Sequence, residues 1–301
     1  MTSARPLTQR ERVVKEALDA VRDRCDVGAR LSADPVSVVH RYVEVLDREL
    51  VALVASSVAF GNVKAVRSKL EEVLAVLGAH PSQAADDPQG LDRALSGWRH
   101  RVFRGQDIAR LLVGARRVQR ARGSLGAALR WHLGGARDPK SLRMALATWC
   151  DEIRAAGGLD RKGRRRGPAH LLPDPRGASG CKRLLLLLRW MCRPNDGVDL
   201  GDWDIDPAIL LIPVDVHVHR LSRNLGLTRR SAPSWATTEE VTRALARFAP
   251  GDPTGYDFSL CHLGMLQRCP SKRDESRCEG CGVKPVCIHW QDRAPRRRIP
   301  G

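Results

Sequence analysis

The sequence predicts an all-α protein. Apolar residues recur at intervals of three and four over most of the chain, which is the spacing of one face of a helix. Alternation of apolar and polar residues, which indicates half-buried strands, is nearly absent. The aromatic residues that favour strands are also scarce, with 2 Tyr and 4 Phe in 301 residues. A chain of this length with 43% hydrophobic residues can bury one large core or two modest ones.

Individual helices are predicted between residues that commonly start and end them. Asp34-Pro35 is a helix start, and glycines separate the helices in the middle of the chain. Residues 86–105 lack the helical pattern and are expected to form a loop. Residues 195–206 hold aspartates at spacings unlike those of a calcium site, so this segment is expected to be a solvated loop. The predicted helices cover residues 8–25, 35–57, 63–77, 105–122, 124–133, 139–156 and 235–248, with one further helix around Lys182 and one from Asp215.

A lysine is predicted in the first turn of a buried helix. Residues 173–180 have the Gly/Pro composition of a turn, and the leucine run 184–188 that follows is typical of a buried helix. Lys182 lies between them, where the helix dipole and the unpaired N–H groups favour anions. We expect this position to lower the pKa of its ammonium group. Because residues that break a local rule are often functional, Lys182 is a candidate catalytic residue.

An aspartate is predicted at the start of the next helix. Asp215 precedes an apolar stripe at helical spacing, which begins with Val218 and ends at Gly226. This pattern predicts that Asp215 is the N-cap of an amphipathic helix. Taken alone, Asp215 is a helix cap; with Lys182 in the same stretch it is also a candidate catalytic carboxylate.

The charge of the chain suits a polyanionic partner. It has 51 Lys and Arg against 34 Asp and Glu, a net charge of +17. Neutralisation of phosphates by such a surface gives affinity without sequence preference, although a genome that favours arginine produces the same excess. The basic residues gather at 99–122, at 161–166 and in a tail over 291–301 that is expected to be disordered. No segment is long and apolar enough for a membrane span or an export signal, so a cytoplasmic protein is expected.

Four of the nine cysteines are predicted to bind a metal centre. Cys269, Cys278, Cys281 and Cys287 have the spacing C-x8-C-x2-C-x5-C, so four thiolates can surround one centre. Zinc and a 4Fe-4S cluster both accept four cysteines. A single C-x2-C pair favours the iron-sulfur cluster, because zinc ribbons commonly have two. The other cysteines are expected to be buried thiols: Cys25, Cys150, Cys181, Cys192 and Cys261.

Three of these features together resemble the motifs of a DNA repair superfamily. They are a hairpin that ends in Gly-x-Lys, an aspartate in V-D-x-H at a helix start, and the C-terminal cysteines. They are similar to those of the helix-hairpin-helix (HhH-GPD) DNA glycosylases, specifically the endonuclease III-like branch with a 4Fe-4S cluster. These motifs cover residues 169–227 and 269–287. From residue 47 to Cys287, the chain more closely resembles a bacterial family of that superfamily, DUF2400.

The resemblance implies a two-lobed helical fold with a C-terminal four-cysteine iron-sulfur loop. Residues 1–33 and 200–301 would form one lobe. Residues 34–199 would form the other, which ends in the helix-hairpin-helix motif at about 169–193. A monomer is expected.

The resemblance also implies a reaction on double-stranded DNA that contains a damaged or modified base. In the superfamily, the lysine that matches Lys182 attacks C1′ of the damaged nucleotide, expels the base and leaves a Schiff base. The aspartate that matches Asp215 stabilises positive charge and handles protons. The damaged base is flipped out of the stack before the attack. The expected protein is thus a nucleoid-associated DNA glycosylase with AP lyase activity.

Further residues are implied as DNA contacts. Backbone N–H groups of the hairpin would hold phosphate. Phe60 and Asn62 lie where related enzymes fill the gap left by the flipped base, and Arg273 and Lys284 would meet phosphates beside the cluster. The hairpin residues are Gly177, Ser179, Gly180 and Cys181.

The sequence departs from the superfamily pattern at several positions. The hairpin L-P-D-P-R-G-A-S-G-C-K is longer than L-P-G-V-G-x-K, and Val216 replaces the threonine of V-D-T-H. The first cysteine spacing is also longer. These departures leave a second hypothesis open, in which a non-catalytic iron-sulfur protein binds damaged or bent DNA.

Overall fold

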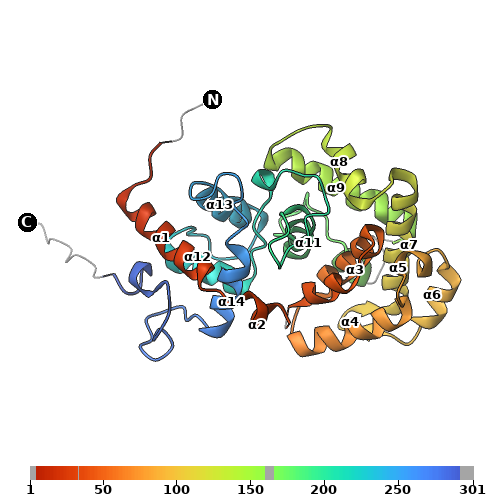
Figure 1. The fold of residues 1–301 in the computed structure, drawn as a ribbon, viewed down its shortest axis with the longest axis horizontal. Coiled ribbons are helices and arrows are strands. Elements are labelled where there is room, and N and C mark those ends of the chain that lie inside the picture. The colour runs from red at the N-terminus through yellow and green to blue at the C-terminus, as the bar shows by residue number, and fades with distance from the viewer. Residues whose placement is uncertain (1–4, 33, 160–165, 292–301) are drawn as a thin grey trace, which may run out of the picture.

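A computed structural model shows an almost entirely helical chain and describes residues 5–32, 34–159 and 166–291. The predicted all-α class is confirmed at this level. In Figure 1, α1, α12, α13 and α14 lie on one side of the molecule and α3 to α9 on the other, with α11 between them. The basic residues 161–165 and tail residues 292–301 lie outside the described residues.

The first half of the chain forms ten helical segments and one β-hairpin within the described residues. Their bounds are α1 Gln9–Asp23, α2 Val27–Leu31, η1 Pro35–Arg41, α3 Val45–Val58, α4 Val63–Leu77, α5 Pro81–Ala84, α6 Pro88–Ala94, β1 Arg99–His100, β2 Phe103–Arg104, α7 Gly105–Arg122, α8 Leu125–Leu133 and α9 Pro139–Gly157.

The second half holds the segments that carry the candidate site. Their bounds are α10 Arg166–Leu171, α11 Lys182–Cys192, η2 Pro207–Ile209, α12 Val216–Leu225, α13 Trp235–Ala246, α14 Asp257–Leu266 and η3 Lys284–Val286.

The single helix predicted over 35–57 is wrong, because the structure divides it in two. Asp34 caps a 3-10 helix, η1, through the Val36 amide. Tyr42 is then extended, and α3 begins only at Val45. The β-branched residues at 36, 38 and 39 are all buried, and such residues lose rotamer freedom in an α-helix.

The loop predicted over 86–105 is also wrong, because this stretch contains α6 and the β-hairpin. The Asp87 side chain accepts a hydrogen bond from the Gly90 amide, and Pro88 occupies the first turn, which together start α6. The two strands of the hairpin are two residues each and pair antiparallel. Strands this short have no detectable sequence alternation.

Two glycines allow the long helices α7 and α9 to cross closely. A Cβ atom on Gly157 would lie 2.1 Å from the Arg110 carbonyl oxygen, and one on Gly114 would lie 2.3 Å from that of Ile153. The backbones are therefore in direct contact at this crossing, which holds the helices behind α11 in a fixed arrangement.

The buried apolar side chains form two clusters. The first runs from Val36 to Leu211 and is joined by Trp235 and Phe258. The second combines α1 with the chain from Ile212 to Val286. Helix α11 belongs to the first cluster and α12 to the second, so the residues at their N-termini lie at the junction between the two. The two predicted lobes and their bounds stay a prediction.

The aspartate-rich segment 195–206 is not the solvated loop that the sequence predicts. Asp199 is fully buried, and its carboxylate pairs with Arg189 of α11 and with Arg193, the residue that follows this helix. Asp202, of which only 8% of the side chain is exposed, pairs with Arg48 of α3. The segment folds inward because arginines on two buried helices need carboxylate partners.

No helix within the described residues has the length and apolar character needed to cross a membrane.

Candidate active site

Lys182 is the first residue of α11, as the sequence predicts. The turn that precedes the helix ends at Cys181, which has a left-handed backbone with φ +45. A non-glycine residue in this region is uncommon, and here it turns the chain from the hairpin into the helix. The Lys182 side chain keeps 34% of its surface exposed.

Asp215 is the N-cap of α12, which is also as predicted. Its Oδ1 atom accepts hydrogen bonds from the amides of His217 and Val218, both at 2.8 Å. Gly226 ends the helix in a left-handed conformation. The cap therefore uses one carboxylate oxygen and leaves the other, Oδ2, for a different partner.

The structure brings Lys182 and Asp215 together. The Nζ atom of Lys182 lies 3.3 Å from Oδ2 of Asp215, within hydrogen-bond and ion-pair distance. Burial opposes the charge on both groups, but their mutual attraction outweighs it. The pKa of Lys182 is raised above its ordinary value, and the pKa of Asp215 is lowered. The lowered lysine pKa predicted from the helix position is therefore wrong, because the neighbouring carboxylate has the larger effect.

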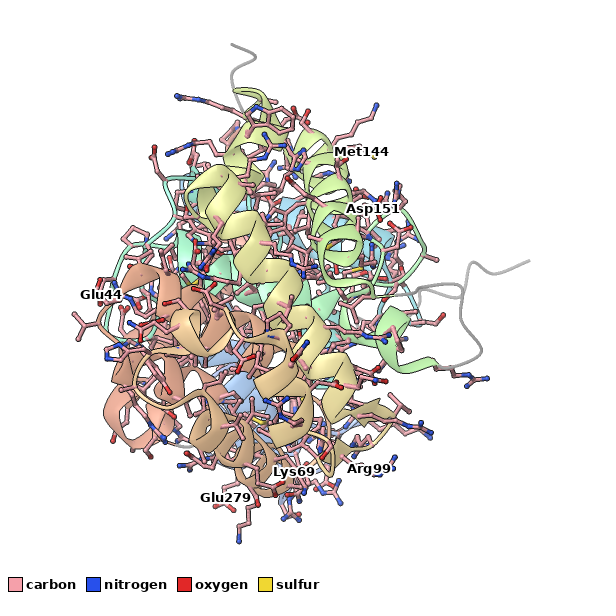
Figure 2. All side chains as sticks on the ribbon, turned by 90° about the vertical axis from the view of Figure 1, so that its right-hand side faces the viewer. Glu44, Lys69, Arg99, Met144, Asp151 and Glu279 are labelled. Atoms are coloured by element: carbon pink, nitrogen blue, oxygen red, sulfur yellow. The ribbon has the colours of Figure 1, made fainter. Side chains whose placement is uncertain are left out.

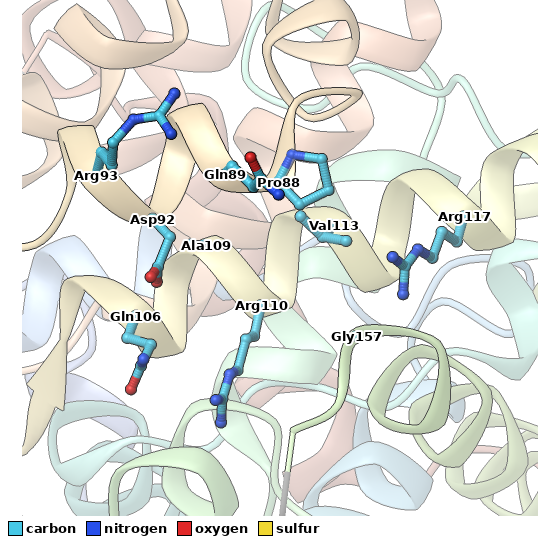
Figure 3. A pocket seen from close by; sticks show the side chains of 10 residues that line it. All are labelled: Pro88, Gln89, Asp92, Arg93, Gln106, Ala109, Arg110, Val113, Arg117 and Gly157. Atoms are coloured by element: carbon cyan, nitrogen blue, oxygen red, sulfur yellow. The ribbon is translucent and has the colours of Figure 1, made fainter.

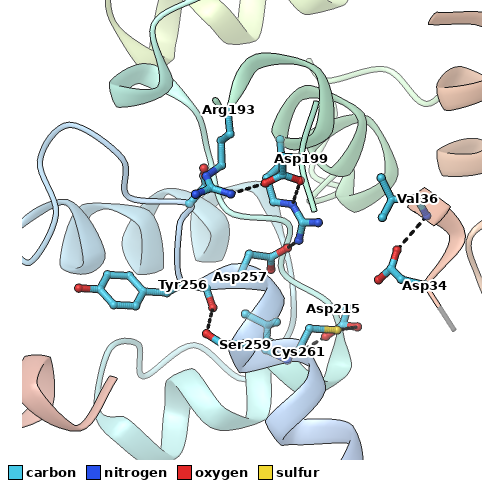
Figure 4. A network of polar contacts seen from close by, with 12 residues as sticks. Asp34, Val36, Arg193, Asp199, Asp215, Tyr256, Asp257, Ser259 and Cys261 are labelled. Atoms are coloured by element: carbon cyan, nitrogen blue, oxygen red, sulfur yellow. Dashed lines mark hydrogen bonds and ion pairs between the residues drawn. The ribbon is translucent and has the colours of Figure 1, made fainter. Parts of the chain in front are cut away.

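Further polar groups lie near Asp215, on α14 and on neighbouring segments, as Figure 4 shows. The Cys261 thiol donates to Asp215 Oδ2 at 3.7 Å. Asp257 is buried beside it and pairs with the buried guanidinium of Arg189, which also bonds Asp199. Burial, reinforced by the charge of Asp215, raises the pKa of Asp257 to about 6 although Arg189 opposes this.

Asp34 and His262 complete the interior of the site. Oδ2 of Asp34 lies 3.7 Å from Nε2 of His262. Burial alone would raise the pKa of Asp34, but the hydrogen bond from His262 and the charge of Arg189 outweigh it, so the pKa is lowered. Sequence reasoning missed four of the groups in this layer, which are Asp34, Arg189, Asp257 and His262. A buried arginine in the leucine-rich helix was the available signal, because such a charge needs carboxylate partners.

The hairpin residues predicted to hold phosphate differ in how their amides are used. The Gly177 amide bonds Asp174 O within the turn, and the Cys181 amide bonds the Ser179 hydroxyl. The amides of Ser179 and Gly180 bond no other described residue, and residues 177–179 are exposed. Two amides at the apex of the hairpin are therefore available to a ligand.

Helices on two sides fix the position of the turn at residues 173–181, which precedes α11. Arg143 of α9 donates to the carbonyl oxygens of Pro175 and Gly177, at 2.9 and 3.0 Å. The carbonyl of Ala178 accepts from the Trp235 amide at the start of α13. The carbonyl oxygens of Pro175, Gly177 and Ala178 therefore already accept hydrogen bonds from the protein.

Phe60 is partly buried among aromatic rings. Its ring meets the rings of His100, Phe103 and His170 edge-on, with centroids 5.2 to 5.6 Å apart. The guanidinium groups of Arg101 and Arg183 lie 5.2 and 5.1 Å from its centre. Asn62 is exposed and caps α4 through the Ala65 amide.

The four C-terminal cysteines lie close to one another. Burial, reinforced by the other three thiols, raises the pKa of Cys269 to about 11, and the remaining thiols also act on one another. The side-chain amide of Asn224 donates to the sulfur of Cys269. Such N–H donors are common around metal-bound thiolates.

The four thiols are of the donor type that binds zinc or an iron-sulfur cluster. Within the described residues, no three His, Cys, Asp or Glu side chains are arranged to hold one metal ion. Asn224 of α12 donates to the Cys269 sulfur at 3.2 Å, and Arg220 donates to the Cys269 carbonyl at 2.8 Å. The helix that begins at Asp215 thus ends against the cysteine loop.

The two basic residues predicted to bind DNA beside the cysteines share one aromatic ring. Arg273 and Lys284 lie on Trp290, each 4.1 Å from its centre. Arg273 is also paired with Glu275 at 2.7 Å. Their charges remain close to the surface of the cysteine loop, but Arg273 already has a carboxylate partner.

Two hollows lie away from the Lys182–Asp215 pair. One, shown in Figure 3, is a groove of about 460 Å³ between α6, α7 and the end of α9, with Arg93, Arg110 and Arg117 around it. The other has a volume of about 240 Å³ and lies between α1, α14 and the cysteine loop. Neither includes Lys182 or Asp215.

Comparison with known proteins identifies a family. No curated protein and no solved structure matches the chain. The family described as "Protein of unknown function (DUF2400)" matches residues 34–266, which is more than half of the chain and includes both Lys182 and Asp215. The match ends before the first of the four clustered cysteines. The chain therefore belongs to the DUF2400 family.

Proposed function

We propose that this protein is a helix-hairpin-helix DNA glycosylase with AP lyase activity, with Lys182 as the nucleophile and Asp215 as its partner. The observation that carries the proposal is the 3.3 Å contact between Lys182 Nζ and Asp215 Oδ2. The two residues are 33 positions apart and come from different helices. Their contact supports the pairing that the motifs of the superfamily imply.

The proposed reaction begins when the Lys182 amine attacks C1′ of a flipped nucleotide. The new C–N bond forms as the bond between C1′ and the base breaks, and the base leaves with the electron pair and takes up a proton. Opening of the sugar ring gives a Schiff base between C1′ and the lysine nitrogen. Loss of a proton from C2′ then expels the 3′ phosphate and cleaves the strand, and water releases the lysine.

Lys182 must lose a proton before it attacks. In the free protein its pKa is raised, so it is an ammonium ion at neutral pH. Asp215 Oδ2 is the nearest described acceptor, and its other oxygen remains bound to the helix amides. DNA that covers the exposed part of Lys182 would exclude water, which disfavours the charged pair and favours transfer of the proton to the carboxylate.

DNA binding would use the exposed hairpin apex and the positive charge. The free amides of Ser179 and Gly180 are suited to a phosphate oxygen, which they can hold without reading the base sequence. The net charge of +17 would add affinity through release of counterions.

The four cysteines would hold a 4Fe-4S cluster, with zinc as the alternative. Bound to these thiolates, the cluster would act as a structural element of the DNA-binding surface. The Asn224 amide would stabilise the thiolate charge of Cys269. Because α12 ends against this loop, the metal would also help to hold Asp215 in place.

Borohydride trapping tests the proposal. The protein is incubated with a duplex that carries one abasic site, reduced, and examined for a covalent adduct. The wild-type protein should be trapped, Lys182→Ala should not, and Asp215→Asn should be trapped more slowly. Arg223→Gln, the loss of an exposed charge on the same helix, should be trapped as wild type. No adduct with wild type, or an equal adduct with Lys182→Ala, would count against catalysis.

A second function is favoured by the charge of Lys182 in the free protein. An ammonium ion in the first turn of a helix can bind a phosphate without reacting, and Asp215 is then a cap and a counter-ion. The protein would recognise damaged or bent duplex and leave it intact. Tight binding to an abasic duplex without any trapped adduct would select this alternative.

A further inference from the structure

We propose that the β-hairpin of residues 99–104 is a separate clamp for the DNA backbone, beside the Lys182 site. The inference rests on the proposed function, because it takes duplex DNA as the partner. Its first observation is the register of the strands, in which Arg99 lies directly opposite Arg104. Like charges at facing positions destabilise a strand pair, so this arrangement needs a compensating partner.

The turn of the hairpin breaks a second local rule. Arg101 has a left-handed backbone with φ +53, at a position where two-residue turns prefer glycine or asparagine. Its neighbour Val102 exposes 45% of its surface. A third arginine and an exposed valine therefore occupy the tip of a hairpin whose strands already carry two facing arginines.

These arginines have no acidic partner in the described part of the chain. Arg99, Arg101 and Arg104 form no ion pair there, whereas many other arginines of the protein do. Arg99 reaches outward at the edge of the molecule in Figure 2, near Lys69 of α4. The hairpin thus offers three arginines without an ion-pair partner among the described residues, which complements a chain of phosphates.

The hairpin is rigidly attached. The indole nitrogen of Trp98 donates to the Lys69 carbonyl at 2.9 Å, and the Gly105 amide donates to the Trp98 carbonyl at 2.8 Å. The inward-facing residues, His100 and Phe103, are buried. A binding element that is already ordered loses little entropy when a ligand arrives.

Direct contacts connect the hairpin to the candidate site. Arg101 covers one face of Phe60, and a Cβ atom on Gly61 would collide with its guanidinium group, at 2.2 Å. Arg183, the residue after Lys182, lies on the same ring and donates to the carbonyls of Ser57 and His170. A duplex held at Lys182 would therefore have the hairpin within reach of its flanking phosphates.

The test compares Arg99→Gln/Arg104→Gln with Arg12→Gln, the loss of one exposed arginine on α1. Affinity for an undamaged duplex and for an abasic duplex is measured by fluorescence anisotropy over a range of salt concentrations. The hairpin variant should bind both duplexes at least about tenfold more weakly, and the slope of log K against log salt should fall by about 0.9 for each lost phosphate contact. Arg12→Gln should bind as wild type.

A stability measurement separates this effect from misfolding. Removal of facing like charges should leave the thermal midpoint of the hairpin variant equal to that of wild type or above it. Unchanged affinity and salt slope would overturn the clamp, as would an equal loss in Arg12→Gln. The trapping assay distinguishes the two proposals. If the protein is trapped on DNA but the β-hairpin variant binds as wild type, only the clamp proposal is wrong. If the protein does not bind duplex at all, both proposals are wrong.

Discussion

Asp215 gives one carboxylate oxygen to the start of its own helix and the other to Lys182. Oδ1 accepts from two amides of α12, and Oδ2 lies 3.3 Å from the lysine nitrogen. The cap fixes the carboxylate, so the second oxygen is held in place for the lysine. The structural role and the proposed catalytic role of Asp215 therefore support each other.

This division of tasks predicts different outcomes for two substitutions. Asp215→Asn keeps a capping side chain, whereas Asp215→Ala loses the cap and should be less stable than the asparagine variant by about 1 kcal/mol. Both should slow strand cleavage at an abasic site by roughly 10²-fold or more, because neither accepts the lysine proton. Chemical denaturation and single-turnover cleavage measure the two effects. Equal cleavage by Asp215→Asn and wild type would show that the carboxylate only caps the helix.

The raised pKa of Asp257 should make the stability of the protein depend on pH. Its pKa is raised from 3.8 to about 6, so folding favours the protonated carboxyl. The stability that this group contributes is complete below about pH 4 and is lost as the pH rises through 6, a change on the order of 3 kcal/mol. The free energy of unfolding of wild type minus that of Asp257→Asn should therefore fall between pH 4 and 6.

Asp204→Asn is the control for this measurement, since 92% of the Asp204 side chain is exposed. Its difference from wild type should be small and should not follow the same pH dependence. A wild-type minus Asp257→Asn difference that is flat from pH 4 to 7 would contradict the raised pKa.

Substitution of Arg189 should cause a large loss of stability. Its guanidinium is 2% exposed and pairs with both Asp199 and Asp257. Arg189→Met would leave two buried carboxylates without this partner and should cost about 3–5 kcal/mol. Adding Asp257→Asn to the methionine variant should recover part of the loss, because one buried charge is removed. No recovery in urea unfolding would mean that the cost comes from packing.

The loop of residues 269–287, which holds the four cysteines, should bind a metal that stabilises the end of α12. Cys278→Ala should lose the metal and lower the thermal midpoint, whereas Cys192→Ala, which alters a buried thiol of α11, should keep the metal. Elemental analysis and the visible absorption of anaerobically purified protein measure this. Stoichiometric zinc in a colourless protein would replace the cluster with a zinc site, and wild-type protein without any metal would remove both.

The sequence predicted the positions of Lys182 and Asp215 because both depend on local rules. A Gly/Pro turn before a leucine run and a cap before an apolar stripe are visible within ten residues. The pKa of Lys182 was predicted with the wrong sign, since it depends on a carboxylate 33 positions away. Local chemistry locates each residue, but only the fold determines the neighbours.

The residues around the pair were missed for related reasons. Helix α14, which carries Asp257 and Cys261, starts at Tyr256 without a side-chain cap, and its apolar residues do not form a single stripe. The burial of Asp199 depends on Arg189 of α11 and on Arg193 just after it, which lie several residues earlier in the chain. Neither feature follows from helical periodicity, which was the main signal in the sequence.

The central claim is that the nitrogen of Lys182 forms a bond to C1′ of DNA. The direct test is mass spectrometry of the wild-type protein after borohydride reduction with an abasic duplex and digestion of both partners. We expect one deoxyribose-derived adduct, located on Lys182, and no adduct in Lys182→Ala. An adduct located on another lysine, or on the N-terminal amine, would contradict the assignment.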